Sequence, residues 1–550
     1  MTQFARDREN VPVLVVGGSL VGLATSVFLA SYGVEVLTVD RHPGTAIHPR
    51  AGHLHLRTLE LMRSVGLEDS LQELSAAKYF PNGSINEVYS LAEGEIATYI
   101  PDLNGGVEEF SPSRRLFVAQ DAIEPLLRSK AIEYGADLVY GSEVVIEGRD
   151  DSGVLAVIRE LATDKERRVR AQYVVGADGS RSTIRSSLGI EMVGHGELSR
   201  SATIYFRADF RHLLGDQQLG VVYVVNDDLR GFFRFEKSGL AGFLVVSSLG
   251  DPMVSGNLDT WEALTPERAR ELVVGALGDE SIDVEIDEVA LWLASACVAT
   301  GYGRERILLV GDAAHVVPPT GGFGGNTGIH DAHNLAWKLA MVVKGQAGGE
   351  LLGTYEDERL PVGRFTIDQA YARFRHRITP EMIDRSVPDL VDDFTAEIGY
   401  CYSSAAVVAD GHQSPDGAIG VHPRDAAGRP GSRAAHFWQD ADVSSLDLFG
   451  QGFVVLAGKE GATWSDAAAR VSRRTGIAIT FHTANCSAED FERLYGVGER
   501  GASLVRPDGF VCWRRVDGVA DPDEALSSAI AGVLARSVED VAPRRTSATV

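Results

Sequence analysis

The stretch from Gly311 to Lys338 restricts the fold more than any other part of this chain. It reads GDAAHVVPPTGGFGGNTGIHDAHNLAWK and lies between an apolar run at residues 307–310 and a helical pattern at residues 329–343. The apolar run predicts a buried strand, and the glycines let the loop backbone approach a ligand closely. The helix start offers free N–H groups and a positive dipole end to an anion. Asp312, at the strand end, can accept hydrogen bonds from sugar-like hydroxyls. The alternative is a structural strand–loop–helix unit with ordinary caps.

A second glycine-rich turn lies near the N-terminus, inside a predicted strand–helix–strand unit. Strands are expected at residues 11–16 and 34–39, with a helix at residues 23–30. The first glycine makes the tight turn and the last lets the helix pack on the strand, while a serine replaces the middle glycine of the usual fingerprint. The second strand ends in an acid that can bind the adenosine ribose, which favours the ADP half of FAD. The residues predicted to bind the dinucleotide are Gly17, Gly18, Ser19, Leu20, Gly22, Asp40 and Arg41.

A third motif, DGSRSTIR, begins at Asp178 after another apolar run. An Asp-Gly pair is a common turn signal, so a plain turn is the alternative interpretation. A turn alone does not require Ser182 and Arg185 downstream, however. We therefore interpret the motif as part of a binding site.

The three motifs together resemble those of the single-component FAD monooxygenases, the p-hydroxybenzoate hydroxylase-like family. The resemblance covers essentially the whole chain and is strongest to the aromatic polyketide hydroxylases. It implies that Asp312 binds the ribityl chain, that the helix start faces the flavin pyrimidine edge, and that Asp178 lies between the FAD and nicotinamide sites. The further cofactor contacts that it implies are Arg50, Gln120, Val144, Pro319, Gly325, Asn326 and Thr327.

The fold class that we expect is α/β. It comprises a Rossmann-like FAD-binding domain, an inserted antiparallel β-sheet that binds substrate, and a C-terminal thioredoxin-like domain. Short β-rich runs predict the sheet, and Thr265 and Pro266 mark the start of a helix that interrupts it. The C-terminal part lacks a C-x-x-C pair, so we expect no disulfide chemistry there. The predicted boundaries are 1–190 and 299–400 for the two parts of the FAD-binding domain (the second with a helical segment), 191–298 for the sheet, 401–431 for a linker and 432–550 for the thioredoxin-like domain.

Composition excludes several classes of function. The chain has 550 residues and a net charge of −25, which makes nucleic acid and anionic membranes poor partners. Its four cysteines are widely spaced, which disfavours a disulfide framework or a zinc site. No run reaches the roughly 18 apolar residues of a transmembrane helix, and the N-terminus does not resemble a signal peptide. We therefore expect a cytoplasmic enzyme without a metal, monomeric or homodimeric.

The reaction that the resemblance implies is monooxygenation with NAD(P)H as co-substrate. Reduced FAD takes up O₂ as a C4a-hydroperoxide, which hydroxylates a phenolic or polycyclic aromatic polyketide. Baeyer–Villiger oxidation or epoxidation of a polyketide is an alternative, and a redox-silent flavin-binding protein is a second. The substrate, the carbon that is oxidised and the choice between NADPH and NADH stay open at this stage.

A base that deprotonates a phenolic substrate would speed hydroxylation, because the phenolate ring is richer in electrons. A tyrosine, with an ordinary pKa of about 10, needs a positive neighbour to serve as that base. Tyr223 shares one face of a predicted strand with Val221 and Val225, and a basic run begins at Arg373. We predict Tyr223 and Arg373 as the catalytic pair. The alternatives are a core tyrosine and a solvated helix face.

Overall fold

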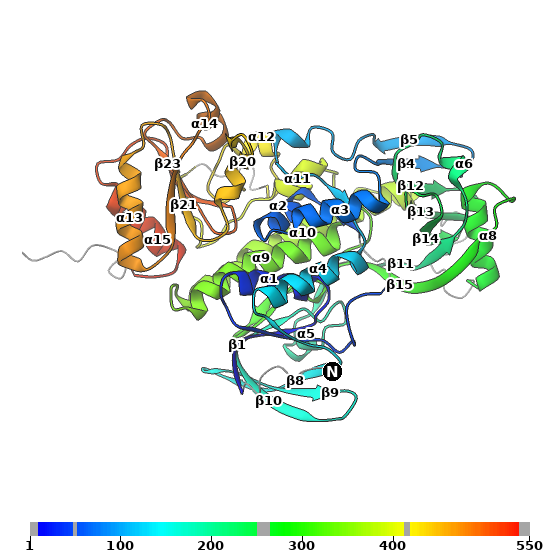
Figure 1. The fold of residues 1–550 in the computed structure, drawn as a ribbon, viewed down its shortest axis with the longest axis horizontal. Coiled ribbons are helices and arrows are strands. Elements are labelled where there is room, and N and C mark those ends of the chain that lie inside the picture. Colours follow the sequence, from blue (N-terminus) through cyan, green and yellow to red (C-terminus); the bar gives the residue numbers. More distant parts are fainter. Residues whose placement is uncertain (1–8, 48–51, 250–263, 412–417, 538–550) are drawn as a thin grey trace, which may run out of the picture.

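The computed structural model describes residues 9–47, 52–249, 264–411 and 418–537. Figure 1 shows three bodies around the long central helices α9 (Phe323–Val343) and α10 (Gly353–Ile378). A sheet with a parallel centre lies below these helices, a second large sheet lies on the right, and a smaller α/β body lies on the left. The central helices therefore contact all three bodies.

The first sheet is the nucleotide-binding type that the N-terminal pattern predicts. Its strand order is β16-β17-β10-β1-β2-β7, with a hairpin of β8 and β9 attached to β10. The four central strands are parallel and rich in Val, Leu and Ile, as expected for strands covered on both faces. Its strands are β1 (Asn10–Val16), β2 (Val36–Val39), β7 (Asp137–Val139), β8 (Ser142–Asp150), β9 (Gly153–Glu160), β10 (Glu166–Gly176), β16 (Gly303–Arg304) and β17 (Ile307–Leu309).

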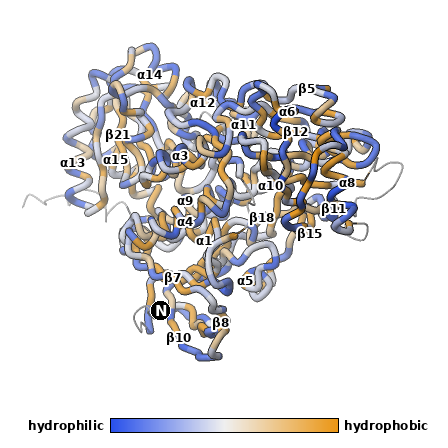
Figure 2. Tube along the Cα trace, turned by 45° about the vertical axis from the view of Figure 1, so that its right-hand side comes forward, coloured by the Kyte–Doolittle hydropathy of each residue, from blue (hydrophilic) through white to orange (hydrophobic). Residues whose placement is uncertain are grey.

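Helices α1 (Leu20–Ser31), α4 (Gln120–Glu133) and α9 pack against one another above this sheet. Helix α9 begins at Phe323, so Gly324 and Gly325 lie in its first turn, ahead of the helical pattern that the sequence shows from residue 329. In Figure 2 the hydrophobic residues lie mostly along these helices and the sheet strands, and the outer loops are mostly hydrophilic.

The second sheet has the strand order β18-β15-β11-β14-β13-β12-β4-β5. Its pairs are antiparallel except for β12 and β4, which are parallel, so the sheet is mixed rather than purely antiparallel. Two of its strands come from residues 84–100, outside the predicted 191–298 segment. The elements of this body are β4 (Ser84–Val88), β5 (Glu95–Ile100), β11 (Met192–Arg207), α6 (Arg211–Leu214), β12 (Leu219–Val225), β13 (Leu229–Phe235), β14 (Ala241–Leu249), α8 (Pro266–Leu277), β15 (Glu285–Ala299) and β18 (His315–Val316).

Helix α8 covers the outer face of that sheet and confirms the predicted helix. The Thr265 side chain caps it by accepting a hydrogen bond from the Arg268 N–H at 3.2 Å. Its buried face packs on Phe206, Phe233 and Phe235. The opposite face of the sheet is therefore the one that turns towards the centre of the molecule.

The C-terminal body is a four-stranded sheet, ordered β22-β21-β23-β24, with α13 and α15 packed together beside it. Trp337 of α9 meets Phe453 of this body edge-on at 6.0 Å between ring centroids. The elements are β19 (Trp438–Asp440), β20 (Val443–Ser444), β21 (Phe453–Ala457), α13 (Thr463–Thr475), β22 (Ile479–Thr483), α14 (Ala488–Tyr495), β23 (Ala502–Val505), β24 (Val511–Arg515) and α15 (Pro522–Val533).

Buried charges join this body to the central helices. Glu358 of α10 accepts from Arg506 at 2.6 Å and from Lys338 of α9 at 2.7 Å, and Arg506 also pairs with Asp508 at 2.6 Å. Burial lowers the pKa of Lys338 to about 8, even though Glu358 beside it acts to raise it. The connecting segments contain β3 (His53–Leu54), α2 (Leu56–Ser64), α3 (Glu68–Lys78), β6 (Leu116–Phe117), α5 (Thr183–Ser187), α11 (Asp393–Ile398), α12 (Pro423–Ala426) and several short 3₁₀ turns.

Candidate active site

The turn between β1 and α1 has the geometry that close approach of a phosphate needs. Gly17 has φ of +109°, and a Cβ at Gly22 would lie 1.9 Å from the Gly17 carbonyl oxygen, so both positions require glycine. No side chain caps the start of α1, which leaves its first N–H groups to a ligand. Asp40 ends β2 and accepts from the Gly18 N–H at 2.5 Å. Leu20 is buried behind the turn, and Arg41 is exposed next to Asp40.

Gln120 and Val144 lie around the same turn. Gln120 donates to Ser19 Oγ at 3.1 Å, and Ser19 Oγ in turn donates to Glu124 at 2.5 Å. Glu124 is fully buried, and it was not singled out in the sequence. Val144 lies on β8, whose first residue donates its N–H to the Asp40 carbonyl at 3.0 Å. The residues predicted to bind the ADP half therefore converge at the carboxyl ends of β1 and β2, where such folds bind ligands.

The Asp-Gly motif and the loop after β17 are joined by one arginine. Asp178 accepts hydrogen bonds from the Ser182 hydroxyl and from the Ile184 N–H, the latter at 3.1 Å. Arg185 then donates to the Ala313 carbonyl at 3.0 Å. The carboxylate of Asp178 thus holds its own turn, and Arg185 fixes that turn against the residue after Asp312.

Asp312 lines the cavity. Its side chain is accessible from the cavity, although the surrounding protein separates it from bulk solvent. Burial raises its pKa above the usual range, and His315 acts in the opposite direction. His315 is in turn held by the fully buried Asp331 at 2.6 Å, which also accepts from Arg359 at 2.7 Å and from the Gly311 N–H at 3.1 Å. A rigid network therefore fixes the loop that presents Asp312.

The start of α9 is pinned by the side chain of Asn326. Its Oδ1 accepts from the His55 N–H at 2.9 Å, and its Nδ2 donates to the His53 and Gly322 carbonyls at 2.7 Å. The side chain is therefore fully used in positioning the loop, and Thr327 is buried beneath it. The helix-start backbone is left to contact a ligand, and Gly324, Gly325 and the preceding Pro319 all line the cavity.

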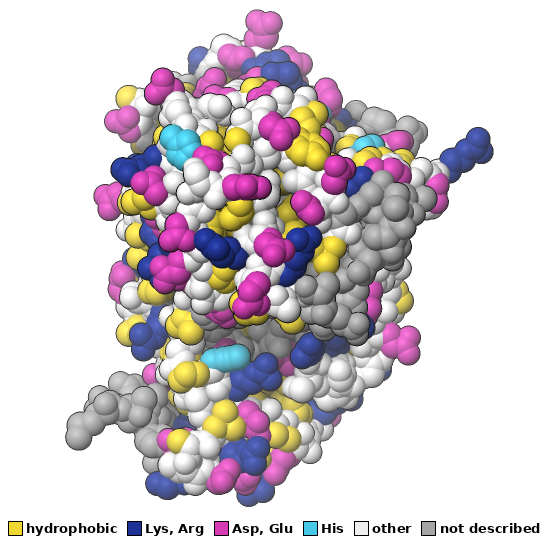
Figure 3. Space-filling view, turned by 90° about the vertical axis from the view of Figure 1, so that its right-hand side faces the viewer, with side chains coloured by type: hydrophobic (Ala, Val, Ile, Leu, Met, Phe, Trp, Pro, Cys, Tyr) yellow, Lys and Arg dark blue, Asp and Glu magenta, His cyan; other side chains and the backbone are white. Residues whose placement is uncertain are grey.

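The cavity has a volume of about 890 Å³ and lies between the second sheet and the loop before α9. This volume falls within the about 300–1,000 Å³ range of small-molecule sites. Asp312, the uncapped start of α9 and the glycine turn at β1 fit the ribityl, pyrimidine and pyrophosphate parts of FAD. Figure 3 shows the outer surface on the side of the second sheet, where acidic and basic side chains are interspersed without one dominant charged patch.

Tyr223 and Arg373 both line this cavity, but they do not pair with each other as predicted. Arg377 donates to the Tyr223 hydroxyl at 3.1 Å, and its guanidinium contacts both the Tyr223 and the Tyr99 rings. Arg373 instead binds Asp393 at 2.9 Å. Burial alone would lower the pKa of Arg377, but the Tyr223 hydroxyl and Asp393 raise it overall. The cation beside Tyr223 is thus one helical turn further along α10 than the sequence suggested.

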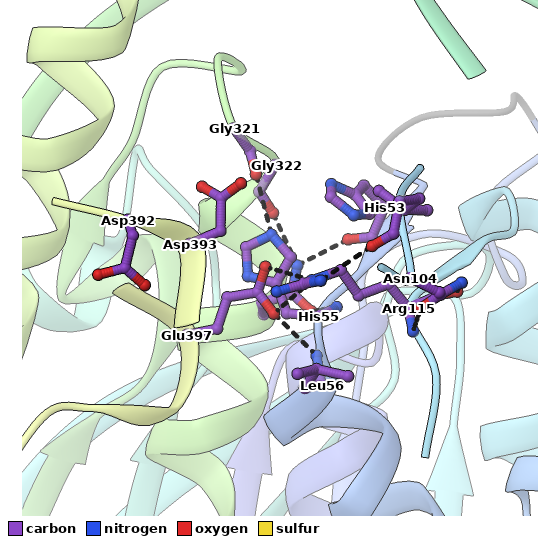
Figure 4. Close-up of polar contacts among 12 residues, drawn as sticks. His53, His55, Leu56, Asn104, Arg115, Gly321, Gly322, Asp392, Asp393 and Glu397 are labelled. Atoms are coloured by element: carbon purple, nitrogen blue, oxygen red, sulfur yellow. Dashed lines mark hydrogen bonds and ion pairs between the residues drawn. The ribbon is translucent and has the colours of Figure 1, made fainter. Parts of the chain in front are cut away.

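A second group of polar side chains lies where α11 lines the cavity. Glu397 accepts from the Leu56 N–H at 3.1 Å and from Arg115 Nε at 2.9 Å (Figure 4). His55 contacts the Gly321 carbonyl at 2.9 Å. His53 and Arg234 also line the cavity, and neither was singled out in the sequence. The signal for Arg234 was its alternation with Phe233 and Phe235, which places it on the opposite face of β13 from that core.

One predicted contact, Arg50, lies outside the described residues. The described part of the chain contains no helix long and apolar enough to cross a bilayer. Nor does it contain a group of His, Cys, Asp and Glu side chains that could hold a metal ion.

Comparison with known proteins gives consistent matches. The model of an FAD binding domain matches residues 10–370, and that of an aromatic-ring hydroxylase C-terminal domain matches residues 427–537. The chain is 55% identical to 4-methyl-5-nitrocatechol 5-monooxygenase of Burkholderia sp, over 96% of this chain and 98% of that protein. It is 38% identical to tetracenomycin B2 monooxygenase-dioxygenase of Streptomyces olivaceus, over 96% and 100%. A crystal structure of aklavinone-11 hydroxylase with FAD and aklavinone superposes with a TM-score of 0.89 at 34% identity, covering 97% of this chain and 100% of that one.

Proposed function

Since this chain belongs to the FAD-dependent aromatic-ring hydroxylases, we propose that it oxygenates a phenol of the nitrocatechol class, which it binds as the phenolate. The observation that carries the proposal is the hydrogen bond from Arg377 to the Tyr223 hydroxyl inside the cavity. A positive charge at that point favours the ionised phenol, which is the form that an oxygenating flavin attacks.

Family membership confirms several predictions from the sequence. The chain is an FAD-dependent monooxygenase of the hydroxylase type, with NAD(P)H as its co-substrate. The α/β fold with an FAD-binding domain and a separate C-terminal domain is confirmed as well. The roles of individual site residues, the domain boundaries and the oligomeric state remain predictions.

When bound, FAD would take electrons from NAD(P)H and activate O₂. The chain's own residues would bind the flavin, place the ring and move a proton. We assign ribityl binding to Asp312 and contact with the flavin pyrimidine edge to residues 325–327. Tyr223 would accept the phenolic proton, and Arg377 would stabilise the charge that remains. Val221 and Phe232 would form an apolar wall that excludes water from the ring.

The nitrocatechol class is supported by similarity over full length. The Burkholderia relative is 55% identical, whereas the tetracenomycin relative is 38% identical over a comparable span. In the proposed reaction one oxygen atom of O₂ bonds to the ring carbon that carries the nitro group, and the other leaves as water. NAD(P)H supplies two electrons. The C–N bond breaks with its electron pair leaving on nitrite, the phenol loses its proton, and the ring becomes a hydroxyquinone.

A second candidate is hydroxylation of a polycyclic polyketide. The cavity volume of about 890 Å³ and the 0.89 TM-score to an aklavinone complex favour it. In that reaction the oxygen replaces a ring hydrogen, so no nitrite forms.

Both candidates can be compared in one assay. The FAD-loaded protein is mixed with NADPH or NADH and with 4-methyl-5-nitrocatechol or aklavinone, and NAD(P)H loss, nitrite and H₂O₂ are followed. We expect nitrocatechol to accelerate NAD(P)H oxidation with stoichiometric nitrite. Acceleration by aklavinone alone would favour the polyketide candidate, and H₂O₂ as the sole product with both would contradict the proposal.

A further inference from the structure

Arg234 is a buried cation without a counterion. Its side chain on β13 is 6% exposed and lines the cavity, yet neither Nε nor Nη2 has a hydrogen-bond partner. Within the described ranges, no ion pair joins it to a carboxylate, whereas Arg373 pairs with Asp393 and Arg115 with Glu397. Buried arginines are almost always paired, because an isolated buried charge is costly. The free N–H groups of Arg234 therefore point to a ligand.

The surroundings hold the Arg234 guanidinium in one place. Its Cζ lies 4.6 Å from the centre of the Tyr79 ring and 4.9 Å from that of Phe117. A Cβ at Gly52 would lie 2.0 Å from Nη1, so a larger residue at this position would require the guanidinium to shift. A fixed planar fork of N–H donors suits a group with two oxygens in one plane.

His53, the residue after Gly52, lies beside the same donors. Its imidazole is 5.1 Å from the Phe117 ring that also contacts Arg234, and its buried Nε2 has no partner. In Figure 4 dashed lines join Arg115 and Glu397 to their neighbours, whereas no dashed line reaches the His53 ring. Burial, together with the nearby His55, Arg115 and Arg234, holds the pKa of His53 well below its usual range. The imidazole is therefore neutral and can donate one N–H.

We propose that Arg234 and His53 form a subsite for the two oxygens of a planar nitro or carboxylate group on the substrate ring. This rests on the proposed function, in which Tyr223 and Arg377 hold the phenolate end. Tyr223 pairs in register with Phe232, and Arg234 lies two residues, or about 7 Å of backbone, further along β13 from Phe232. Both side chains line the same cavity from neighbouring strands, so one substituted benzene ring can present its oxygen to Tyr223 and its planar group to Arg234.

The subsite would act in the reaction as well as in binding. When oxygen adds to the nitro-bearing carbon and the C–N bond breaks, negative charge develops on the departing nitrite. The Arg234 guanidinium, already in place, stabilises that charge as it forms. Arg234 is thus both a specificity-determining residue and a leaving-group donor.

The test compares ligands that differ only in the planar group. Catechol, 4-nitrocatechol and 3,4-dihydroxybenzoate are titrated into the FAD-loaded protein, with the flavin absorbance as the readout. We expect the wild type to bind the nitro or the carboxylate ligand more tightly than catechol, and whichever of the two it prefers identifies the group. Arg234→Met should weaken binding of that ligand about 10- to 100-fold, the effect of losing a charge-assisted hydrogen bond. Binding of catechol should change little.

Arg207→Met serves as the matched control, because Arg207 lies on β11 of the same sheet but pairs with Asp287 at the surface. It should leave all three affinities unchanged. The subsite would be overturned if Arg234→Met weakened the binding of all three ligands equally. It would also be overturned if the wild type bound the nitro and carboxylate ligands no more tightly than catechol. If Arg234→Met does not bind FAD, His53→Phe is tested in its place. We expect His53→Phe to reduce the preference for the nitro or carboxylate ligand over catechol, and an unchanged preference would overturn the proposal.

Binding is measured without turnover, so the two proposals fail separately. A wild type that prefers 4-nitrocatechol through Arg234 but releases no nitrite would refute the denitrating reaction and support the subsite.

Discussion

Tyr223 and Arg377 meet because a strand and a helix from distant parts of the chain face the same cavity. Tyr223 lies on β12, and Arg377 lies near the end of α10, where its guanidinium also contacts Tyr99. Arg373 is one helical turn earlier and is neutralised by Asp393. The two arginines therefore differ in what they can do for a bound phenol. Arg377 is placed to stabilise a phenolate, whereas Arg373 is bound to Asp393 at the start of α11.

Replacing Tyr223 with Phe should preserve FAD content and lower hydroxylation by about 10²- to 10⁴-fold, the usual effect of losing a general base. Arg377→Met should raise the pKa of the bound phenol, because a positive charge no longer favours the phenolate. Its pH–rate profile should then move to higher pH. Arg373→Met provides the comparison and should shift the profile less. A wild-type rate and full coupling in Tyr223→Phe would rule out the tyrosine as the base.

Asp312→Ala should weaken FAD binding by about 1.5–3 kcal/mol, because the ribityl hydroxyls lose a charged acceptor. The raised pKa of Asp312 in the free protein adds a pH dependence. The ionised carboxylate is a stronger hydrogen-bond acceptor than the protonated acid, so FAD affinity should rise as the pH increases from the ordinary aspartate value of about 4 through the raised pKa. Flavin fluorescence titrations at several pH values measure both effects. An Asp312→Ala variant that keeps the wild-type pH dependence would show that another group titrates.

At the scale of elements, the turn between β1 and α1 sets how closely the helix approaches the strand. Gly22→Ala would place a methyl group 1.9 Å from the Gly17 carbonyl oxygen. Overpacking of this kind costs about 1–3 kcal/mol, and here it also opens the turn that we propose to contact FAD. We expect lower thermal stability together with lower FAD content. Gly532→Ala is the control: a Cβ there has open space within α15, so stability should stay the same or rise by up to about 1 kcal/mol.

The strand–glycine–helix elements of the candidate FAD site were predictable from sequence because local periodicity and glycine spacing fix them. The glycine turn, the Thr265-capped helix and the loop at Asp312 all follow such short-range rules. The partner of Tyr223 depends instead on how α10 is rotated against the second sheet, and no local pattern distinguishes Arg373 from Arg377. The addition of β4 and β5 to that sheet likewise depends on a parallel pairing between segments far apart in the chain. Arg234 was missed because its lack of a partner is visible only in three dimensions.

At the scale of the whole molecule, the C-terminal body and helix α9 are parts of one buried charge network. Arg506→Met would leave Glu358 and Asp508 short of a partner at fully buried positions. Breaking a buried ion pair from one side costs about 3–5 kcal/mol. Denaturant unfolding should show that loss. Arg500→Met, which removes an exposed pair with Asp517, should cost no more than about 1 kcal/mol. Similar losses in the two variants would mean that the junction does not stabilise the molecule.

The proposed function requires the transfer of one oxygen atom from O₂ to a phenol held at Tyr223 and Arg377. The direct measurement is turnover of 4-methyl-5-nitrocatechol under ¹⁸O₂ with NAD(P)H, followed by mass spectrometry of the product and assay of nitrite. We predict a product with one ¹⁸O atom and one nitrite for each NAD(P)H oxidised. An unlabelled product, or NAD(P)H oxidation in which all the oxygen appears as H₂O₂, would contradict the account.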